Sequence, residues 1–323
     1  MNIEKKIRFC DRVGIKESEE NLEFLDVYLN HDLKFFVDPV LIRQAAKEEG
    51  PYQYLYKRMV LNIDSFFGEI ARMTIASESL KDSGILKRSG ETQATHLGYS
   101  RVNSSGRGSS EQILLEVFDF VRANDLIEKK VIFSLDQTPV YVPNFREDRM
   151  SDLIISLIRY ELAEFSYIQS EKHNLVDAFV TTEPVPVGYC WDAESKTWVK
   201  KTYRLLNPDA EPVLLIPRRI LGKSLIYSPT RYLSMVLGEK QEEYRNSGSP
   251  YNGKGKDGEV KPPPKKLIAR VEVDAEGLRV KEYLLRNSKY FTRFERGSVH
   301  LAARNPEGLS VKVIEDMRKK QDE

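Results

Sequence analysis

Two acidic residues at the start of an expected helix have the types and spacing of a magnesium site. The segment Arg146 to Asp152 (REDRMSD) contains Asp148 and Asp152, and an α-helix places residues four apart on one face. Two carboxylates in that arrangement bind Mg²⁺ together with a substrate phosphate, as in metal-dependent phosphodiester hydrolysis. The alternative is that these carboxylates cap the helix and complement its dipole.

Glu211 is a further candidate catalytic carboxylate. It precedes the apolar segment Pro212 to Ile216 (PVLLI), which is typical of a buried strand. Arg218 and Arg219 follow that segment, where they are candidate contacts to nucleic-acid phosphates or ordinary solvated side chains.

A glycine-rich loop, Gly98 to Ser110 (GYSRVNSSGRGSS), has the composition of an anion-binding loop. Its glycines allow close backbone approach, its arginines supply charge, and a helix N-terminus follows directly. It matches neither of the two standard nucleotide-binding motifs, so a capped surface loop is the alternative. The candidate phosphate-binding residues are Gly98, Arg101, Gly106, Arg107 and Gly108.

Cations alternate with aromatic residues between Arg279 and Arg296 (RVKEYLLRNSKYFTRFER). Cations for phosphates and aromatic faces for bases are typical of a nucleic-acid surface, and an amphipathic helix with a solvated cationic face is the alternative. We expect Arg279, Arg286, Lys289, Tyr290 and Arg293 to contact nucleic acid, and reversal of Arg286, Lys289 and Arg293 to glutamate to abolish binding.

Charge is distributed unevenly along the 323 residues, although the net charge is only +1. Residues 1–196 carry 24 Lys and Arg against 32 Asp and Glu, a balance of −8. Residues 197–304 carry 22 against 12, a balance of +10, and residues 305–323 carry 4 against 5. The basic stretch indicates an anionic partner, for which nucleic acid is the commonest.

Several classes of protein are disfavoured by the composition. The first residues carry no signal-peptide pattern, and no window is apolar enough to span a membrane. Cys10 and Cys190 are too few for a disulfide framework, and the four histidines lie far apart in the sequence. We therefore expect a soluble cytoplasmic protein without membrane partners or a histidine-based zinc site.

Helical periodicity predicts the elements that hold these residues. Apolar residues recur at helical spacing in three strong segments, and a capping box of Ser109 and Gln112 begins the second of them. Further along, two segments are also consistent with helices, and the C-terminus ends in a charged helix. The expected helices are 51–76, 111–121, 150–169, 228–244 and 276–291.

Strands are expected where the periodicity changes to two. Alternation on either side of Asn30 to Asp32 predicts a β-hairpin over 25–37. Loops are expected at 79–90 and 246–266, and prolines favour extended backbone over 138–145. The remaining expected strands are 185–192, 197–206, 212–216 and 267–273.

These elements predict an α+β fold, with a helix-rich acidic domain over 1–180 and a basic region over 181–323 that carries a small, mostly antiparallel sheet. The leading hypothesis for function is a nucleic-acid-acting protein, with magnesium-dependent phosphodiester cleavage as its candidate activity. One alternative is a non-catalytic interaction protein or subunit, with a protein partner or a second copy of itself. The other is a nucleotide-phosphate enzyme or sensor that uses the Gly98 to Ser110 loop.

Overall fold

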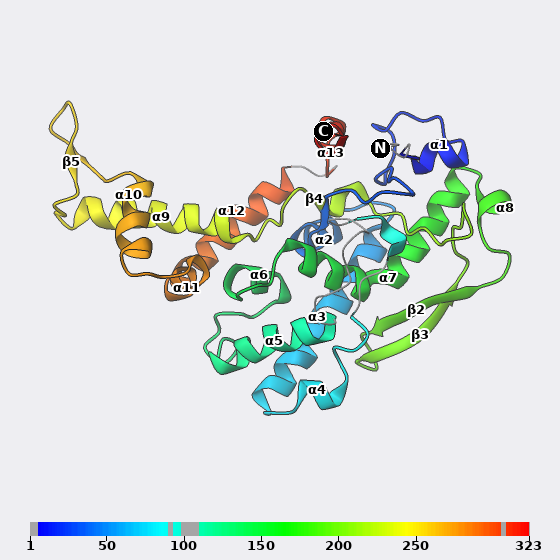
Figure 1. The fold of residues 1–323 in the computed structure, drawn as a ribbon, viewed down its shortest axis with the longest axis horizontal. Coiled ribbons are helices and arrows are strands. Elements are labelled where there is room, and N and C mark those ends of the chain that lie inside the picture. The colour runs from blue at the N-terminus through cyan, green and yellow to red at the C-terminus, as the bar shows by residue number, and fades with distance from the viewer. Residues whose placement is uncertain (1–5, 90–92, 98–109, 305–307, 323) are drawn as a thin grey trace, which may run out of the picture.

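The computed structural model is a helix-rich α+β protein (Figure 1). It describes residues 6–89, 93–97, 110–304 and 308–322. Within these ranges the strands form three antiparallel sheets of two strands each. The fold class expected from the sequence is therefore confirmed.

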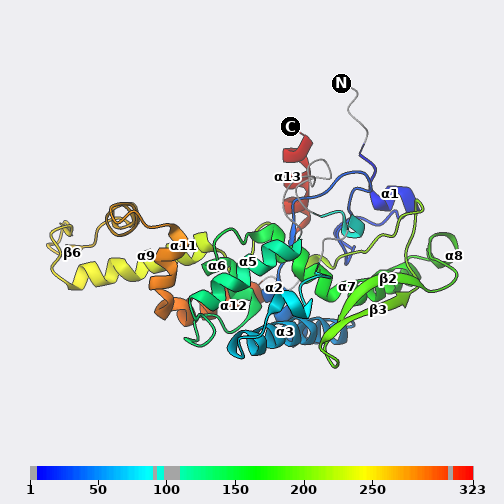
Figure 2. The ribbon, with the colours of Figure 1, turned by 60° about the horizontal axis from the view of Figure 1, so that its bottom comes forward.

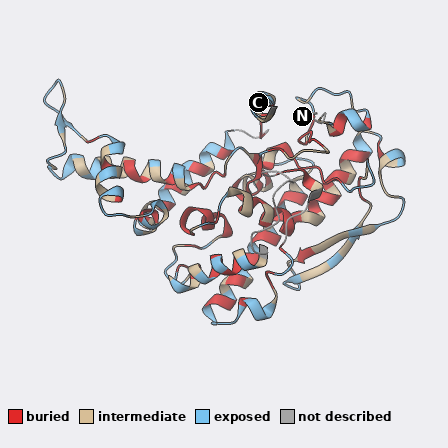
Figure 3. Ribbon diagram, viewed as in Figure 1, coloured by how far each residue is buried: buried red, intermediate tan, exposed pale blue. Residues whose placement is uncertain are grey.

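Three helices form the centre of the molecule: α2 (Pro39–Lys47), α3 (Gln53–Ile75) and α7 (Glu147–Lys172). The apolar stripe of α3 is buried, including Met59, Ile63 and Phe66, as its periodicity predicted. Helix α7 is buried on more than one side, because α3 and the β2–β3 hairpin both pack on it. Buried segments accordingly concentrate in this central region (Figure 3).

Helix α2 begins at a buried aspartate. Asp38 caps the helix, accepting a hydrogen bond from Val40 N at 2.8 Å, and Pro39 occupies the first-turn position that tolerates proline. The second carboxylate oxygen accepts one from Ile226 N at 2.6 Å. Burial raises the pKa of Asp38 to about 6, and the charge of Asp136 adds to the shift.

The longest strands form a hairpin at one side of the molecule, β2 (Val185–Asp192) with β3 (Thr197–Tyr203). This hairpin was predicted from the period-two alternation. Trp191 and Trp198 are directly opposite each other and pack edge-to-face on Phe66 of α3. A register shift lies between Pro186 and Gly188, and a Cβ atom on Gly188 would lie 2.9 Å from Nη1 of Arg159.

The C-terminal part extends away from the centre along α9 (Pro229–Asn246), which carries the small β5–β6 hairpin at its far end (Figure 1). Helix α12 (Phe291–Ala303) returns to pack on α2. Helix α13 (Val311–Asp322) then lies near the N-terminal segment (Figure 2). The remaining elements are α1 (Phe9–Val13), α4 (Leu80–Ser83), η1 (Gln93–Thr95), α5 (Ser110–Ala123), η2 (Leu135–Gln137), α6 (Thr138–Tyr141), α8 (Val176–Phe179), η3 (Arg218–Ile220), α10 (Lys265–Ala269), η4 (Arg270–Asp274), α11 (Val280–Arg286), η5 (Ser288–Tyr290) and the strands β1 (Phe36–Val37), β4 (Leu221–Gly222), β5 (Gly253–Lys254) and β6 (Val260–Lys261).

The predicted hairpin over 25–37 is wrong. This segment bonds to distant backbone instead, with Leu25 N donating to Ile216 O and Leu33 N to His96 O, each at 3.0 Å. Only Phe36–Val37 forms a strand, which pairs with β4. The alternation misled because the polar residue Asp26 is fully buried, whereas a surface hairpin keeps its polar face in water.

Two segments are helical where extended backbone was expected. One contains prolines, and the other is rich in β-branched residues. Helix α6 occupies the start of 138–145, because proline is acceptable in a first turn and Ser134 with Gln137 forms a capping box just before it. The expected strand 267–273 is part of α10 and of the π-helix η4, which buries Ile268 and Val273. Burial of these side chains outweighed the β-propensity of valine and isoleucine.

Three smaller differences concern element boundaries. The expected strand 212–216 is not assigned, although residues 213–216 are buried, and the expected loop 79–90 contains α4, capped by Ser79. The expected helix 276–291 is broken at Asn287, which separates α11 from η5 and α12. Asn287 Nδ2 bonds to Tyr283 O, and the Asn287 carbonyl accepts from Tyr232, which holds the break in place.

One hydrophobic core runs through both of the expected domains. Buried residues of α3 and α7 belong to the same contiguous cluster as Tyr232, Phe291 and Phe294. The boundary expected near residue 180 stays a prediction.

Candidate nucleic-acid interface

The two aspartates of the predicted magnesium site lie in the first two turns of α7. Asp148 and Asp152 are both half-buried, and their helical spacing places them on one face. Oδ1 of Asp148 is buried and accepts no hydrogen bond from the described part of the chain. Such an oxygen is costly without a partner. The N-cap of α7 is Arg146, and no side chain caps the helix, so Asp148 is not its cap.

Glu211 does not join these aspartates. It is exposed and lines a separate hollow of about 300 Å³ with His96, Pro186 and Leu214. Across the described residues, no group of three or more His, Cys, Asp or Glu side chains is placed to hold a metal ion. Asp148 and Asp152 therefore supply at most a two-carboxylate site.

The glycine-rich loop, Gly98 to Ser110, lies outside the described residues apart from Ser110, the first residue of α5. Its proposed phosphate-binding residues, Gly98, Arg101, Gly106, Arg107 and Gly108, stay a prediction.

The basic C-terminal segment carries its cations in ion pairs. Arg286 contacts Glu276 and Glu282 at 3.2 and 3.0 Å, and Arg293 contacts Glu239 at 2.8 Å. Glu243 approaches Lys289 at 3.6 Å and accepts a hydrogen bond from the Tyr290 hydroxyl. Carboxylates thus interrupt the positive face expected here, although exposed pairs of this kind are weak.

Four further cations do not all follow this pattern. Burial lowers the pKa of Lys281 to about 8, and Lys281 Nζ donates to Val142 O and Phe145 O. Arg279 is exposed. Arg218 is buried and donates to the carbonyls of residues 19 and 20, whereas Arg219 pairs with Glu48. Arg218 is thus a structural residue rather than an open phosphate contact.

A different surface gathers tyrosines and cations where the β2–β3 hairpin lies along α7. The rings of Tyr160 and Tyr167 on α7 flank that of Tyr203 on β3, with centroids 5.5 and 5.8 Å apart. Lys201 lies 5.0 Å from the centre of the Tyr160 ring, and Arg204 lies 5.4 Å from that of Tyr167. We call these five residues, together with Arg58 on α3, the tyrosine surface; Arg58 lies 5.7 Å from the Tyr160 ring.

Arg204 of the tyrosine surface has no carboxylate partner among the described residues. It donates to Thr181 O and to the Tyr167 hydroxyl. On the opposite face of the hairpin, the centre of the Tyr189 ring lies 4.0 Å from Arg88 and 5.6 Å from Lys200. Arg58 is paired with Glu161 and Glu164, and Lys201 approaches Asp192 at 3.4 Å.

A family comparison covers most of this architecture. A family model matches residues 14–228, about two thirds of the chain. The chain belongs to the family described as Domain of unknown function (DUF8370). The matched span contains α7, β2 and β3, and so the whole tyrosine surface, but ends before α9.

The comparisons with curated proteins and with solved structures found no related protein. No curated protein and no solved structure matches the chain significantly. None of the helices in the described ranges has the length and apolarity needed to cross a membrane.

The sequence reasoning missed the tyrosine surface because its members are far apart in the chain. Alternation within β3 does place Lys201 and Tyr203 on one face of the strand, which is a usable signal. Only the packing of the hairpin on α7 brings Tyr160 and Tyr167 beside them.

Proposed function

We propose that this protein binds nucleic acid through the tyrosine surface. The observation that carries the proposal is the row Tyr167, Tyr203 and Tyr160 with a cation against each outer ring. Tyrosine faces stack on bases of any sequence, while arginine and lysine contact the phosphates. The surface therefore suits a single-stranded segment, in which bases are free to stack.

The ion pairing of the cations favours the tyrosine surface, rather than the C-terminal helices, as the binding site. Arg204 of the tyrosine surface lacks a carboxylate partner among the described residues, whereas Arg286, Lys289 and Arg293 each have at least one. A phosphate displaces no existing ion pair at Arg204 but competes with a glutamate at each of the other three.

Matched charge reversals test the location. We expect Lys201→Glu with Arg204→Glu to weaken binding of a fluorescent single-stranded oligonucleotide by at least tenfold at low salt, because two phosphate contacts of the tyrosine surface become repulsive. Fluorescence anisotropy measures the affinity, and circular dichroism checks the fold. The control, Arg286→Glu with Lys289→Glu, makes the same change in charge and should reduce affinity much less.

The two variants separate the outcomes. Loss of binding in the control alone would indicate that the interface lies on the C-terminal helices. Absence of salt-sensitive binding by the unaltered protein, with both DNA and RNA, would overturn the proposal and favour the interaction-protein alternative.

A magnesium-dependent nuclease is a second candidate, favoured by the buried Oδ1 of Asp148, which accepts no hydrogen bond from the described residues. Mg²⁺ is commonly held by one or two carboxylates plus substrate phosphates, so Asp148 and Asp152 suffice in number. We expect Asp148→Asn and Asp152→Asn to reduce cleavage of a labelled oligonucleotide at least a hundredfold while the melting temperature changes little, since asparagine keeps the size of aspartate and neither residue caps the helix. Cleavage that persists in both variants, or in chelator, would refute this candidate.

A further inference from the structure

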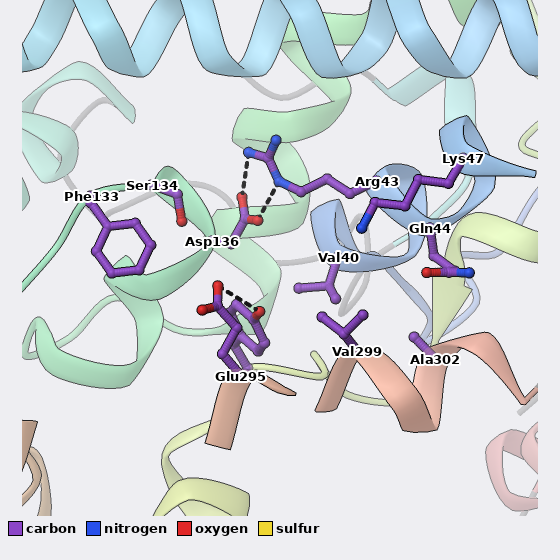
Figure 4. Close-up of a pocket in the computed structure, with 11 residues that line it drawn as sticks. Val40, Arg43, Gln44, Lys47, Phe133, Ser134, Asp136, Glu295, Val299 and Ala302 are labelled. Atoms are coloured by element: carbon purple, nitrogen blue, oxygen red, sulfur yellow. Dashed lines mark hydrogen bonds and ion pairs between the residues drawn. The ribbon is translucent and has the colours of Figure 1, made fainter. Parts of the chain in front are cut away.

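A cavity lined by both charged and apolar side chains lies between α2, the turn around η2 and α12 (Figure 4). Its volume is about 240 Å³, roughly that of eight water molecules. Helix α2 presents Val40, Arg43, Gln44 and Lys47 to it, which are the positions of one helix face. Glu295, Val299 and Ala302 of α12 line the opposite side, outside the span matched by the family.

Arg43 is already neutralised inside this cavity. Its guanidinium contacts Asp136 at 2.6 Å and Asp64 at 2.6 Å. Asp136 is buried, so the Arg43–Asp136 pair forms a fixed wall (Figure 4). Arg43 and Asp136 therefore leave little net charge for a ligand to meet.

Two opposite charges at the cavity have no ionic partner in the described part of the chain. Lys47 is exposed at the end of α2, and Glu295 is half-buried on α12. Glu295 Oε1 accepts a hydrogen bond from the Tyr227 hydroxyl at 3.3 Å. Burial, and then the charge of Glu295, raises the pKa of Tyr227 above its usual range, so this hydroxyl remains a donor.

The surroundings of the two charges also differ. Glu295 lies on the side of the cavity that carries Phe133 and Tyr227, and the Phe133 side chain is 54% exposed. A carboxylate beside aromatic rings suits a bound ammonium group. Lys47 is accompanied by Gln44, and both can donate to an acid group. Val40, Val299 and Ala302 provide apolar contact between the two ends (Figure 4).

We propose that this cavity binds a small dipolar molecule of the amino-acid class, with its ammonium group at Glu295 and its acid group at Lys47. The proposal is independent of nucleic-acid binding, because the tyrosine surface and the cavity share no residue.

Thermal-shift and calorimetric measurements on the full chain test this proposal. The probes are the twenty α-amino acids, 4-aminobutyrate and 6-aminohexanoate, with butylamine and butyrate as single-charge controls. We expect at least one dipolar probe to bind saturably, and neither single-charge compound to bind within tenfold of its affinity. Glu295→Gln and Lys47→Gln should each weaken that binding at least tenfold. Glutamine retains an acceptor for Tyr227, and the control Lys57→Gln alters an exposed lysine of α3 outside the cavity.

The outcomes are distinct. No saturable binding of any dipolar probe overturns the proposal. Binding of butylamine or butyrate as tight as that of the dipolar probe also overturns it, because one charged contact would then suffice. Binding unaffected by both glutamine variants would place the ligand elsewhere and reject the cavity.

Discussion

Phe291→Ala should lower the free energy of unfolding by about 3–5 kcal/mol, the range for removing a large aromatic side chain from a core. Phe291 is buried at the start of α12, with ring centroids of Tyr227 and Tyr232 both at 5.4 Å. Tyr141 and Phe294 complete the cluster at 5.8 and 5.6 Å. The substitution therefore leaves a cavity and removes several edge-to-face contacts at once. Urea unfolding followed by circular dichroism measures the change.

Leu301→Ala is the matched control on the same helix. Leu301 is 55% exposed, so its truncation should cost less than about 1 kcal/mol. The transition also reports on domain organisation, because Tyr141 comes from the expected N-terminal domain and Phe291 from the basic region. Two separate transitions, with only the second shifted by Phe291→Ala, would contradict packing of both parts on one core.

The long helices could be predicted because their sequence determines both their period and their buried face. For α3, the stripe Leu55, Met59, Ile63 and Phe66 leaves no other arrangement that hides these side chains. The β2–β3 hairpin was equally local, since its two strands are joined by a short polar turn. In both cases the residues that decide the structure are close together in the chain.

Segments governed by distant partners were not predictable in this way. Asp26 looks like a solvent-facing residue, yet it is buried and accepts hydrogen bonds from Arg8 and from Cys10 N. Ile268 and Val273 look like strand residues, yet both are buried in helical segments, and the helix of Ile268, α10, packs on α9. Local propensity is a weak preference, and burial against a remote element overrides it.

The candidate sites also divide into features set by neighbouring residues and features set by distant parts of the chain. The i,i+4 spacing of Asp148 and Asp152 is local and the structure retains it on α7. The position of Glu211 relative to these aspartates depends on the tertiary fold, and nothing in the sequence indicated that they are separate. The cavity likewise combines α2 with α12, about 250 residues later in the chain, so no sequence window could contain it.

Arg318→Ala should release α13 from the rest of the protein and cost about 3 kcal/mol. Arg318 is buried, and its guanidinium contacts both carboxylate oxygens of Glu19 and, at 2.6 Å, the Asp26 carbonyl. Removing one partner of a buried ion pair leaves the other charge uncompensated, which typically costs 3–5 kcal/mol. The lower end applies here, because undocking of this terminal helix lets water reach Glu19 again. Urea unfolding measures the cost, and hydrogen exchange of residues 311–322 measures the release.

Two further variants separate charge from geometry. Arg318→Lys keeps the charge but cannot contact Glu19 and Asp26 simultaneously through a planar fork, so an intermediate loss is expected. Lys319→Ala alters the exposed neighbour and should change stability by less than about 0.5 kcal/mol.

Because Arg8 also contacts Glu19 at 3.1 Å and Asp26 at 2.6 Å, a near-neutral Arg318→Ala would mean that Arg8 alone compensates both carboxylates. Hydrogen exchange of α13 that is as slow in Arg318→Ala as in the unaltered protein would then show that apolar contacts, such as those of the buried Ile314, hold the helix instead.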